Sequence, residues 1–404
     1  MKKNVRSLCL CLLLHAALAT VACAQAAPPS PAFAEGRDSF TVPFELVDNR
    51  IFVEVLVEGQ PFKFILDTGG DGILSEEAAA RIGAKRGAQV EGRGAGESIV
   101  RAWQTSVRET RLGGLALKDQ PYTVFDFSDL RHVFGAQTFD GVIGLSVFSQ
   151  SVVRVDYERR RLTFTRPSKF TYSGAGVRVP FERERLIPII RGEVDGTSAR
   201  FGLDTGDRSA FTLKGPFVEQ NHLRERYSPR VEAVTGFGIG GPIRAQVVRV
   251  GVLKFGGFEI KGPVTRLSLQ KAGAFAAGDV AGNIGGAILK QFTVTFDYSR
   301  RRIFFEKNSA YGRRDAYDRA GLWLSRSADG RAFEVFDVVA RGPAAEAGLK
   351  AGDRVLRIDG RSVESLPLTE ARSELKDARR KSVRLTVEDG PRTREVVVRL
   401  RDLV

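Results

Sequence analysis

Two aspartates in matching local settings are the residues best suited to do chemistry in this sequence. They open the triplets Asp67-Thr68-Gly69 and Asp204-Thr205-Gly206, each directly after an apolar segment. A single triplet of this kind is typical of a tight turn, because Asp, Thr and Gly are all common in turns. Two carboxylates held close together share one proton, since like charges at short range do not both ionise cheaply. Such a pair can take a proton from water and give one to a carbonyl, which is the chemistry of amide hydrolysis without a metal.

The triplets lie in a segment that occurs twice along the chain. Val-Pro-Phe-Glu at 42–45 recurs at 179–182, and the triplets follow at the same offset. Further on, Ile143-Gly144 returns as Ile284-Gly285, and Asp156-Tyr157 with its basic run returns as Asp297-Tyr298. A long repeat indicates related structural units. Alternating apolar residues before turn signals predict short strands in both copies, and therefore two mostly β lobes.

Each copy also places an apolar-Gly segment well downstream of its triplet. The first copy reads Phe139-Asp140-Gly141-Val142-Ile143-Gly144-Leu145. This arrangement resembles the pepsin-like and retropepsin-like aspartic proteases. The resemblance implies a mainly β, bilobal fold of two related β-barrel-like lobes, with Asp67 and Asp204 as the catalytic pair on one chain.

The same resemblance assigns supporting roles to the other residues of the triplets. Thr68 and Thr205 are expected to hydrogen-bond across the lobe interface. Gly69 and Gly206 are expected to let the backbone approach the carboxylates closely, so that the pair is preorganised.

Glycine-rich segments in each copy are candidate flaps, the hairpins with which this family closes its cleft. The candidates are Gly92, Gly94 and Gly96 in the first copy and Gly236, Gly238 and Gly240 in the second. Two such tips would be more retropepsin-like than pepsin-like. As nucleotide-binding loops they fail, because no Gly-Lys-Ser/Thr follows and neither opens a helix within a βαβ unit.

Several residues depart from the family pattern. The position after each triplet usually holds Ser, Thr or Ala, but here it holds Gly70 and Asp207, and Asn283 is polar where an apolar residue is expected. Asp71 and Arg208 occupy equivalent places, so we expect them to pair across the pseudo-twofold axis. These neighbours predict a shifted pH optimum, since Asp207 would raise the pKa of the pair and Arg208 would lower it.

The small number of cysteine and histidine residues disfavours metal and thiol chemistry. The three cysteines all lie in the first 23 residues, and only His132 and His222 lie beyond residue 24. A zinc site is therefore disfavoured, and no cofactor is expected. Ser146 lacks the second glycine of a nucleophile elbow, which argues against a serine hydrolase.

The C-terminal part has a different pattern. Ala347-Gly348-Leu349-Lys350-Ala351-Gly352-Asp353 predicts a short helix ended by glycine and a turn into a strand, and it resembles a bacterial PDZ domain. A flanking helix is expected from helical spacing over 368–378. By resemblance, the C-terminal carboxylate of a ligand would meet backbone N–H groups near Gly321, Leu322, Trp323 and Leu324, and the ligand would add as a strand.

The N-terminus has the features of an export signal. Basic residues are followed by an apolar run over about 8–22 and then by small residues. This pattern predicts a secretory signal peptide cleaved after Ala24, with lipidation at Cys23 as the alternative. The net charge of +14 comes from scattered Arg and Lys residues, which favours a solvated basic surface over nucleic-acid binding.

Together these observations predict an organisation and a function. We expect a signal peptide at 1–24, a linker or propeptide at 25–38, protease lobes at 39–170 and 171–307, and an α+β PDZ domain at 308–404. The predicted function is a monomeric aspartic endopeptidase of the bacterial cell envelope, periplasmic or lipid-anchored, that acts on peptide or protein substrates. The PDZ domain would bind substrate C-termini or regulate the protease. The alternative is a peptide-binding envelope protein that keeps the cleft but has little or no turnover.

Overall fold

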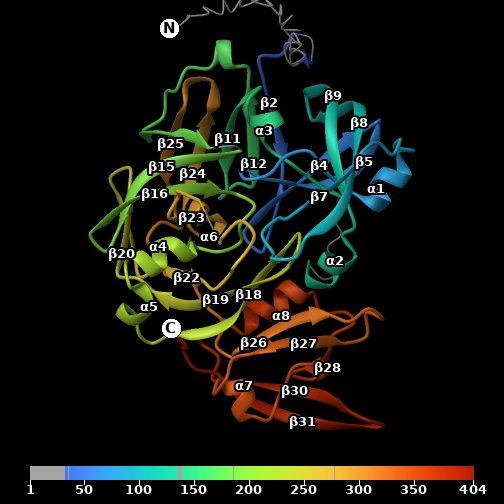
Figure 1. Cartoon of the computed structure of the whole chain (residues 1–404), viewed down its shortest axis with the longest axis vertical. Helices are drawn as coiled ribbons and strands as arrows, with labels where there is room; N and C mark the ends of the chain where they lie inside the picture. The colour runs from blue at the N-terminus through green and yellow to red at the C-terminus, as the bar shows by residue number, and fades with distance from the viewer. Residues whose placement is uncertain (1–31, 35, 135–138, 185, 277) are drawn as a thin grey trace, which may run out of the picture.

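The computed structural model describes residues 32–34, 36–134, 139–184, 186–276 and 278–404 (Figure 1). The predicted signal peptide and the site of cleavage or lipidation lie outside the described residues. Across those ranges, no helix combines the length and the apolar character needed to span a membrane.

Lobe one is built on a sheet with strand order β1-β9-β6-β10-β5-β4-β8-β7, and β3 pairs with β4. Its strands are β1 (Ala32–Phe33), β3 (Glu45–Val47), β4 (Arg50–Val57), β5 (Gln60–Leu66), β6 (Ile73–Ser75), β7 (Gln89–Gly92), β8 (Val100–Leu112), β9 (Leu115–Phe125) and β10 (Gly141–Ile143). Its helices are α1 (Glu76–Arg81), α2 (Ser128–Phe134) and α3 (Leu145–Phe148).

Lobe two repeats this plan with strand order β18-β19-β22-β17-β23-β16-β15-β20-β21, and β14 pairs with β15. Its strands are β14 (Glu182–Glu184), β15 (Ile187–Val194), β16 (Thr197–Asp204), β17 (Phe211–Leu213), β18 (Val231–Gly238), β19 (Gly241–Arg249), β20 (Val252–Phe255), β21 (Phe258–Lys261), β22 (Val264–Ser268) and β23 (Gly282–Gly285). Its helices are α4 (Gly215–Gln220), α5 (Leu223–Arg226) and α6 (Gly286–Leu289).

A third sheet joins the lobes, in the order β13-β25-β24-β11-β12-β2. Its strands are β2 (Ser39–Pro43), β11 (Val152–Asp156), β12 (Arg161–Thr165), β13 (Val177–Pro180), β24 (Phe292–Asp297) and β25 (Arg302–Lys307), with 3₁₀ turns at Pro167–Lys169 and Tyr298–Arg300. Strands β11 and β24 pair antiparallel, and the apolar residues of both lobes form one continuous buried cluster. The lobes therefore fold around a shared core.

The two aspartates are positioned by the same strand pairing in each lobe. Strand β5, which leads into Asp67, runs parallel to β10, and β16, which ends at Asp204, runs parallel to β23. Gly144 at the end of β10 packs against the Asp67 loop so closely that a Cβ there would lie 1.8 Å from the Asp67 carbonyl oxygen. This contact explains why the repeated segment ends in glycine.

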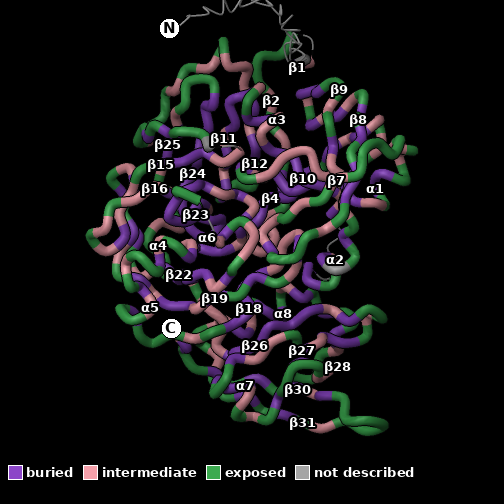
Figure 2. The backbone as a smooth tube through the Cα atoms, viewed as in Figure 1, coloured by how far each residue is buried: buried purple, intermediate pink, exposed green. Residues whose placement is uncertain are grey.

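The C-terminal part has a separate buried core that extends from Ala320 to Leu400. Its sheet has the order β26-β27-β28-β30-β31, with strands β26 (Leu322–Arg326), β27 (Phe333–Val338), β28 (Arg354–Ile358), β29 (Arg361–Ser362), β30 (Ser382–Asp389) and β31 (Arg392–Arg399), and helices α7 (Pro343–Glu346) and α8 (Leu368–Glu374). The flanking helix is shorter than its spacing predicts, because α8 ends at Glu374 and Ala378 lies exposed beyond it. Figure 2 shows buried backbone along the strands of all three parts and also where this part meets the lobes.

Candidate active site

Asp67 and Asp204 come together where the two lobes meet. Each triplet lies at the end of its strand, and the two carboxyl groups lie close enough for the charge of Asp67 to raise the pKa of Asp204. The triplet glycines allow this approach, since a Cβ on Gly206 would lie 2.3 Å from Asp67 Oδ2 and one on Gly69 would lie 3.3 Å from Asp204 Cγ. The sequence repeat therefore brings its two candidate catalytic residues into one site.

The triplet threonines link the lobes symmetrically beneath the aspartates. The backbone N–H of Thr68 donates to Thr205 Oγ1 and the N–H of Thr205 donates to Thr68 Oγ1, both at 3.0 Å. The hydroxyl of Thr68 donates to the Leu203 carbonyl and that of Thr205 to the Leu66 carbonyl. Both threonines are fully buried, so every polar group in this link needs its partner. The link holds the two loops in a fixed relation.

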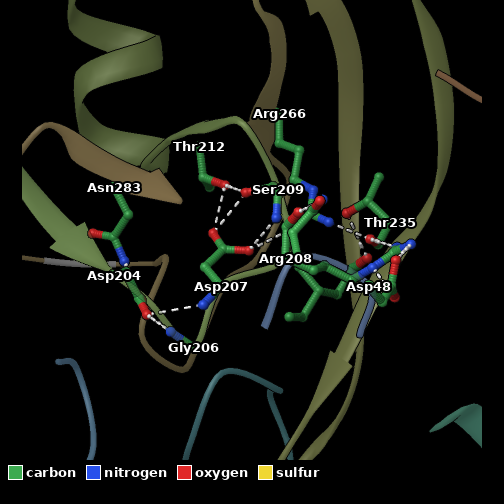
Figure 3. A network of polar contacts seen from close by, with 12 residues as sticks. Asp48, Asp204, Gly206, Asp207, Arg208, Ser209, Thr212, Thr235, Arg266 and Asn283 are labelled. Carbon is green, nitrogen blue, oxygen red and sulfur yellow. Dashed lines mark hydrogen bonds and ion pairs between the residues drawn. The ribbon is translucent and has the colours of Figure 1, made fainter. Parts of the chain in front are cut away.

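Backbone and side-chain N–H groups hold the carboxylates in place. Gly69 N–H donates to Asp67 Oδ1 at 2.7 Å. Asp204 Oδ1 accepts from the N–H groups of Gly206 and Asp207, and its Oδ2 accepts from the side-chain amide of Asn283 at 2.9 Å (Figure 3). The polar residue that departs from the family pattern is therefore a direct partner of Asp204.

The electrostatics of the pair favour one shared proton. Burial raises the pKa of Asp67, and burial together with the charge of Asp67 raises the pKa of Asp204 well above its usual value. Because neither carboxyl ionises easily beside the other, the pair holds one proton over a range of pH. In that state one member can accept a proton while the other donates one.

The residues after the triplets have different surroundings in the two lobes. A side chain in place of Gly70 would put its Cβ 3.0 Å from both Asp67 Oδ2 and Val142 Cγ1, so the loop is tight there. Asp207 is buried in an ion pair with Arg266 at 3.2 Å and accepts from the N–H and hydroxyl of Ser209 (Figure 3). Burial opposes its ionisation, but these partners hold the pKa of Asp207 below its usual value.

The expected pairing of Asp71 with Arg208 is wrong. Asp71 accepts from the N–H of Gly144 and from the N–H and hydroxyl of Ser146, at 2.8 to 2.9 Å, and these local donors satisfy its carboxylate within lobe one. Arg208 instead pairs with Asp48 of lobe one, and its Nη2 lies 2.7 Å from Asp48 Oδ1. The nearest strong acceptor for Arg208 is therefore a turn aspartate that the repeat comparison does not identify.

The candidate flap glycines form two hairpin tips that touch. The β7–β8 hairpin is flap one and the β18–β19 hairpin is flap two. Gly96 N–H donates to the Ile239 carbonyl and Ser98 N–H to the Gly240 carbonyl, both at 2.9 Å. A Cβ on Gly96 would lie 2.1 Å from Gly240 C, so this approach requires glycine. Gly92 ends β7, Gly94 lies beside Ile239, and Gly236 and Gly238 lie in β18.

A cleft of about 770 Å³ lies between the aspartates and the flap tips. Its walls include Asp67 and Asp204, residues of both flaps, and an apolar set made up of Ile65, Ile73, Phe127, Leu130, Phe139 and Val142 on lobe one and Ile187, Phe275 and Val280 on lobe two. A proton-sharing pair in an apolar, flap-covered cleft has the features needed for amide hydrolysis.

Two family models match parts of this chain and agree with this geometry. Residues 53–147 match the family model described as aspartyl protease, and residues 334–389 match the PDZ domain model. The chain combines an aspartyl protease-like domain with a PDZ domain. The predicted fold class is confirmed. Among solved structures, the aspartic proteinase from Irpex lacteus is similar at 15% identity and a TM-score of 0.43, covering 67% of this chain and 98% of its own. No curated protein matches the chain.

The predicted peptide-binding residues of the PDZ domain lie against the protease lobes. The N–H groups of Gly321 and Leu322 donate to the Asp318 carboxylate, and the Leu324 carbonyl accepts from Arg372 Nη2 at 2.6 Å. Trp323 is buried in a cluster with Val133 of α2 and Val234 of β18. Gly321, Leu322 and Leu324 therefore have partners within the C-terminal part, and Trp323 is covered by the protease lobes.

Sequence reasoning missed several charged residues that support the site. Arg50 Nε donates to the Gly206 carbonyl at 2.8 Å, which ties lobe one to the second triplet. Arg266 neutralises Asp207, and Asp48 receives Arg208. Arg266 lies in β22, all of whose residues are buried, and an arginine within a buried strand is the signal that points to a buried ion pair.

Proposed function

We propose that the protease lobes hydrolyse peptide bonds with water activated between Asp67 and Asp204. The observation that carries the proposal is the pair itself: two buried carboxyl groups that line one flap-covered cleft and are held by the threonine link at its base. The enzyme would be an aspartic endopeptidase.

The reaction follows from the shared proton. The ionised carboxylate takes a proton from water as its oxygen attacks the scissile carbonyl carbon, while the protonated carboxyl gives its proton to the carbonyl oxygen. The resulting tetrahedral species collapses when the nitrogen gains a proton and the C–N bond breaks. The N–H groups that hold Asp67 and Asp204 keep the carboxylates oriented throughout.

The cleft supports peptides with bulky apolar side chains near the scissile bond. Ile65, Phe127 and Val142 line the cleft on the lobe one side, and Phe275 and Val280 on the lobe two side. Burying an aliphatic or aromatic side chain there gains about 1.5–3 kcal/mol. This gain favours extended peptides with apolar residues on both sides of the bond to be cut.

The cellular setting is part of the same proposal. The basic and apolar N-terminal segment supports export to a bacterial periplasm or anchoring to the envelope through Cys23. The enzyme would act as a monomer, since both aspartates come from one chain. Its PDZ domain would bind peptide C-termini or regulate the protease.

A second candidate function is peptide binding without turnover. Gly70 favours it, since this glycine removes a hydroxyl that steadies the carboxylate in the family pattern. The cleft and the flaps would serve such a binder equally well.

A peptide-library digest across pH separates the two functions. The wild-type chain should cleave, and Asp67→Asn and Asp204→Asn should each lower the rate by about 10²–10⁴-fold, the usual contribution of a general acid or base. Asp119→Asn is the matched control, since Asp119 is exposed and its left-handed backbone tolerates Asn. Cleavage by either dyad variant at the wild-type rate would refute the dyad. Binding of the library by wild type without cleavage would establish the second function.

A further inference from the structure

The edge strand of the PDZ domain packs against both protease lobes. Strand β26 contacts α2 of lobe one, and the adjoining β27 contacts β18 of flap two. In Figure 1 the C-terminal part lies directly below the two lobes. The centre of this interface is a small buried apolar cluster of Val133, Val234 and Trp323, with Phe237 packed against it. Trp323 lies outside the core of the PDZ domain itself, so its burial depends on the protease lobes.

Flap two is held by polar and aromatic contacts from the PDZ domain. The Asp337 carboxylate accepts from the Val234 N–H at 2.7 Å and from Arg244 Nη2 at 2.8 Å, and both donors belong to the flap two hairpin. The ring of Phe237 lies 4.8 Å from that of Phe336 and 5.8 Å from that of Trp323. Docking of the PDZ domain therefore holds flap two from its middle, at Val234 and Arg244, to Phe237 next to the tip that meets flap one.

The groups with which a PDZ domain receives a peptide are already bonded within this chain. A peptide that adds as a strand needs the free N–H and C=O groups of the edge strand and of the loop before it. Here Asp318 occupies the N–H groups of Gly321 and Leu322, and Arg372 of α8 spans to the Leu324 carbonyl. A peptide reaches this groove only by displacing these contacts.

The same interface extends to the second catalytic loop. Arg208, which follows the second triplet closely in sequence, pairs with Asp48 and lies 5.1 Å from the Trp323 ring centroid. Arg372 lies 4.6 Å from that centroid, and its Nη1 is 3.8 Å from Asp48 Oδ2. Asp48 therefore joins lobe one, the catalytic loop of lobe two and the PDZ domain. Despite burial, these cations hold its pKa well below the usual value.

We propose that the PDZ domain is an internal latch on flap two, and that peptides with a free carboxyl end compete with the latch. When the domain undocks, it releases flap two and exposes the edge of β26. A cavity of about 590 Å³ bordered by Gly321, Leu322, Asp48 and Lys376 lies beside the groove and gives a peptide end a place to enter. Any effect of the latch on peptide cleavage rests on the proposed function, whereas the contacts that form the latch do not depend on that function.

Reciprocity sets what must be observed. A ligand shifts the docked and undocked states only by its difference in affinity for them. Docking of the PDZ domain and binding of peptide are coupled equilibria if docking blocks the groove. A bound peptide then weakens docking by some factor, and a substitution that abolishes docking must strengthen peptide binding by the same factor. Flap two and the groove therefore have to respond together.

The test measures hydrogen exchange and peptide binding in the full chain carrying Asp67→Asn, so that neither readout needs catalysis. Trp323→Ala should speed amide exchange over 231–249 about tenfold or more. Asp337→Asn, which removes the ion pair to Arg244, should have a smaller effect in the same direction. Asp359→Asn is its matched control, because Asp359 also accepts one backbone N–H and pairs with one arginine, both inside the PDZ domain.

The binding arm uses a random hexapeptide pool with free carboxyl ends and the same pool amidated. The free-acid pool should bind Trp323→Ala about tenfold more tightly than the Trp323 chain, and the amidated pool should show no such gain. Exchange in β30 and β31 reports whether the PDZ domain of the variant stays folded. Unchanged exchange over 231–249 with β30 and β31 still protected, or equal binding of the free-acid pool to both chains, would overturn the latch. Loss of hydrolysis in otherwise wild-type protein would overturn only the proposed function.

Discussion

The two catalytic loops share an inner layer of contacts, made by the triplet residues themselves. They differ in an outer layer of contacts, made by the residues that follow the triplets. In both, a threonine crosses to the other lobe and a triplet N–H holds the carboxylate. Outside that layer, lobe one uses Asp71, which accepts from neutral donors on Gly144 and Ser146. Lobe two has Arg208 in the equivalent place and a buried ion pair between Asp207 and Arg266.

This difference shows where each loop gets its support. The Asp71 bonds stay inside lobe one, where its partners are neutral donors, and burial raises the pKa of Asp71. The lobe two loop is held by charges, and through Arg208 it depends on Asp48 of the other lobe. Changes to the shared inner contacts should therefore have equal effects in the two lobes, whereas changes to the outer contacts should have different effects.

Apart from replacing the aspartates themselves, the largest expected effect comes from breaking the shared threonine link. Thr68→Val and Thr205→Val each leave a buried N–H of the other threonine without its acceptor, which costs about 1–3 kcal/mol. If the catalytic geometry loses a similar amount, kcat/KM falls about 10–100-fold. Denaturant unfolding and peptide kinetics measure both quantities.

Symmetry is the decisive point of that comparison. The two variants should match each other, and Thr68→Ser and Thr205→Ser should retain most of the activity because they keep the hydroxyl. A strong loss from one lobe with none from the other would show that the inner layers are not equivalent.

A smaller effect should come from separating the flaps. In Gly96→Ala the new Cβ would lie 2.1 Å from Gly240 C, so the tips must part and the Gly96 bond to Ile239 is lost. We expect KM to rise about tenfold with a lesser change in kcat, because closure of the cleft over substrate is impaired.

Gly92→Ala supplies the matched control for the flap. A Cβ at Gly92 meets nothing within 4 Å, so its kinetics should stay near wild type. Equal kinetics for the two alanine variants would mean that contact between the tips is irrelevant to binding.

The smallest expected effect concerns Asn283, which gives Asp204 a hydrogen-bond donor that Asp67 lacks at the equivalent place. Asn283 donates to Asp204 Oδ2, whereas lobe one has Val142 at the equivalent place. A donor favours the ionised carboxylate, so Asn283→Val should raise the apparent pKa of the pair and move the acidic limb of the pH–rate profile to higher pH. Val142→Asn should move that limb to lower pH.

Profiles of kcat/KM against pH measure both shifts, because they report the ionisations of the free enzyme. If Asn283→Val lowered the rate without moving the acidic limb, Asn283 would contribute to packing and not to the pKa of the pair. If the acidic limb moved in the same direction in Asn283→Val and in Val142→Asn, hydrogen bonding by Asn283 would not be the cause of the shift.

The sequence predicts most of the fold because its evidence there is repeated. Two triplets, two apolar-Gly segments and two Asp-Tyr turns in one order leave little freedom for the strands that carry them, and Asp67 and Asp204 meet as predicted. The PDZ domain likewise follows from the helix and turn around Gly348 and Gly352.

The partners of the long charged side chains could not be predicted in this way. Repeat symmetry suggests that Arg208 meets Asp71, but the loop places local N–H donors on Asp71 and leaves Arg208 to reach Asp48. The docking of Trp323 could not be predicted from the sequence for a similar reason. Its cluster joins three segments far apart in the chain, and the sequence of each segment predicts only an ordinary strand or helix.

The strand pair at the centre of the interlobe sheet has a consequence for how such a chain could arise. Arg154 and Thr295, each two residues before the repeated aspartate of its own lobe, are opposite each other in the β11–β24 pairing. The two copies therefore meet at the same point of their own sequence, as two identical halves would around a twofold axis. Fusion into one chain removes the need for the halves to stay alike. One half can then differ from the other, as it does at Asn283, Asp207 and Arg208, and through Arg208 it reaches the third domain.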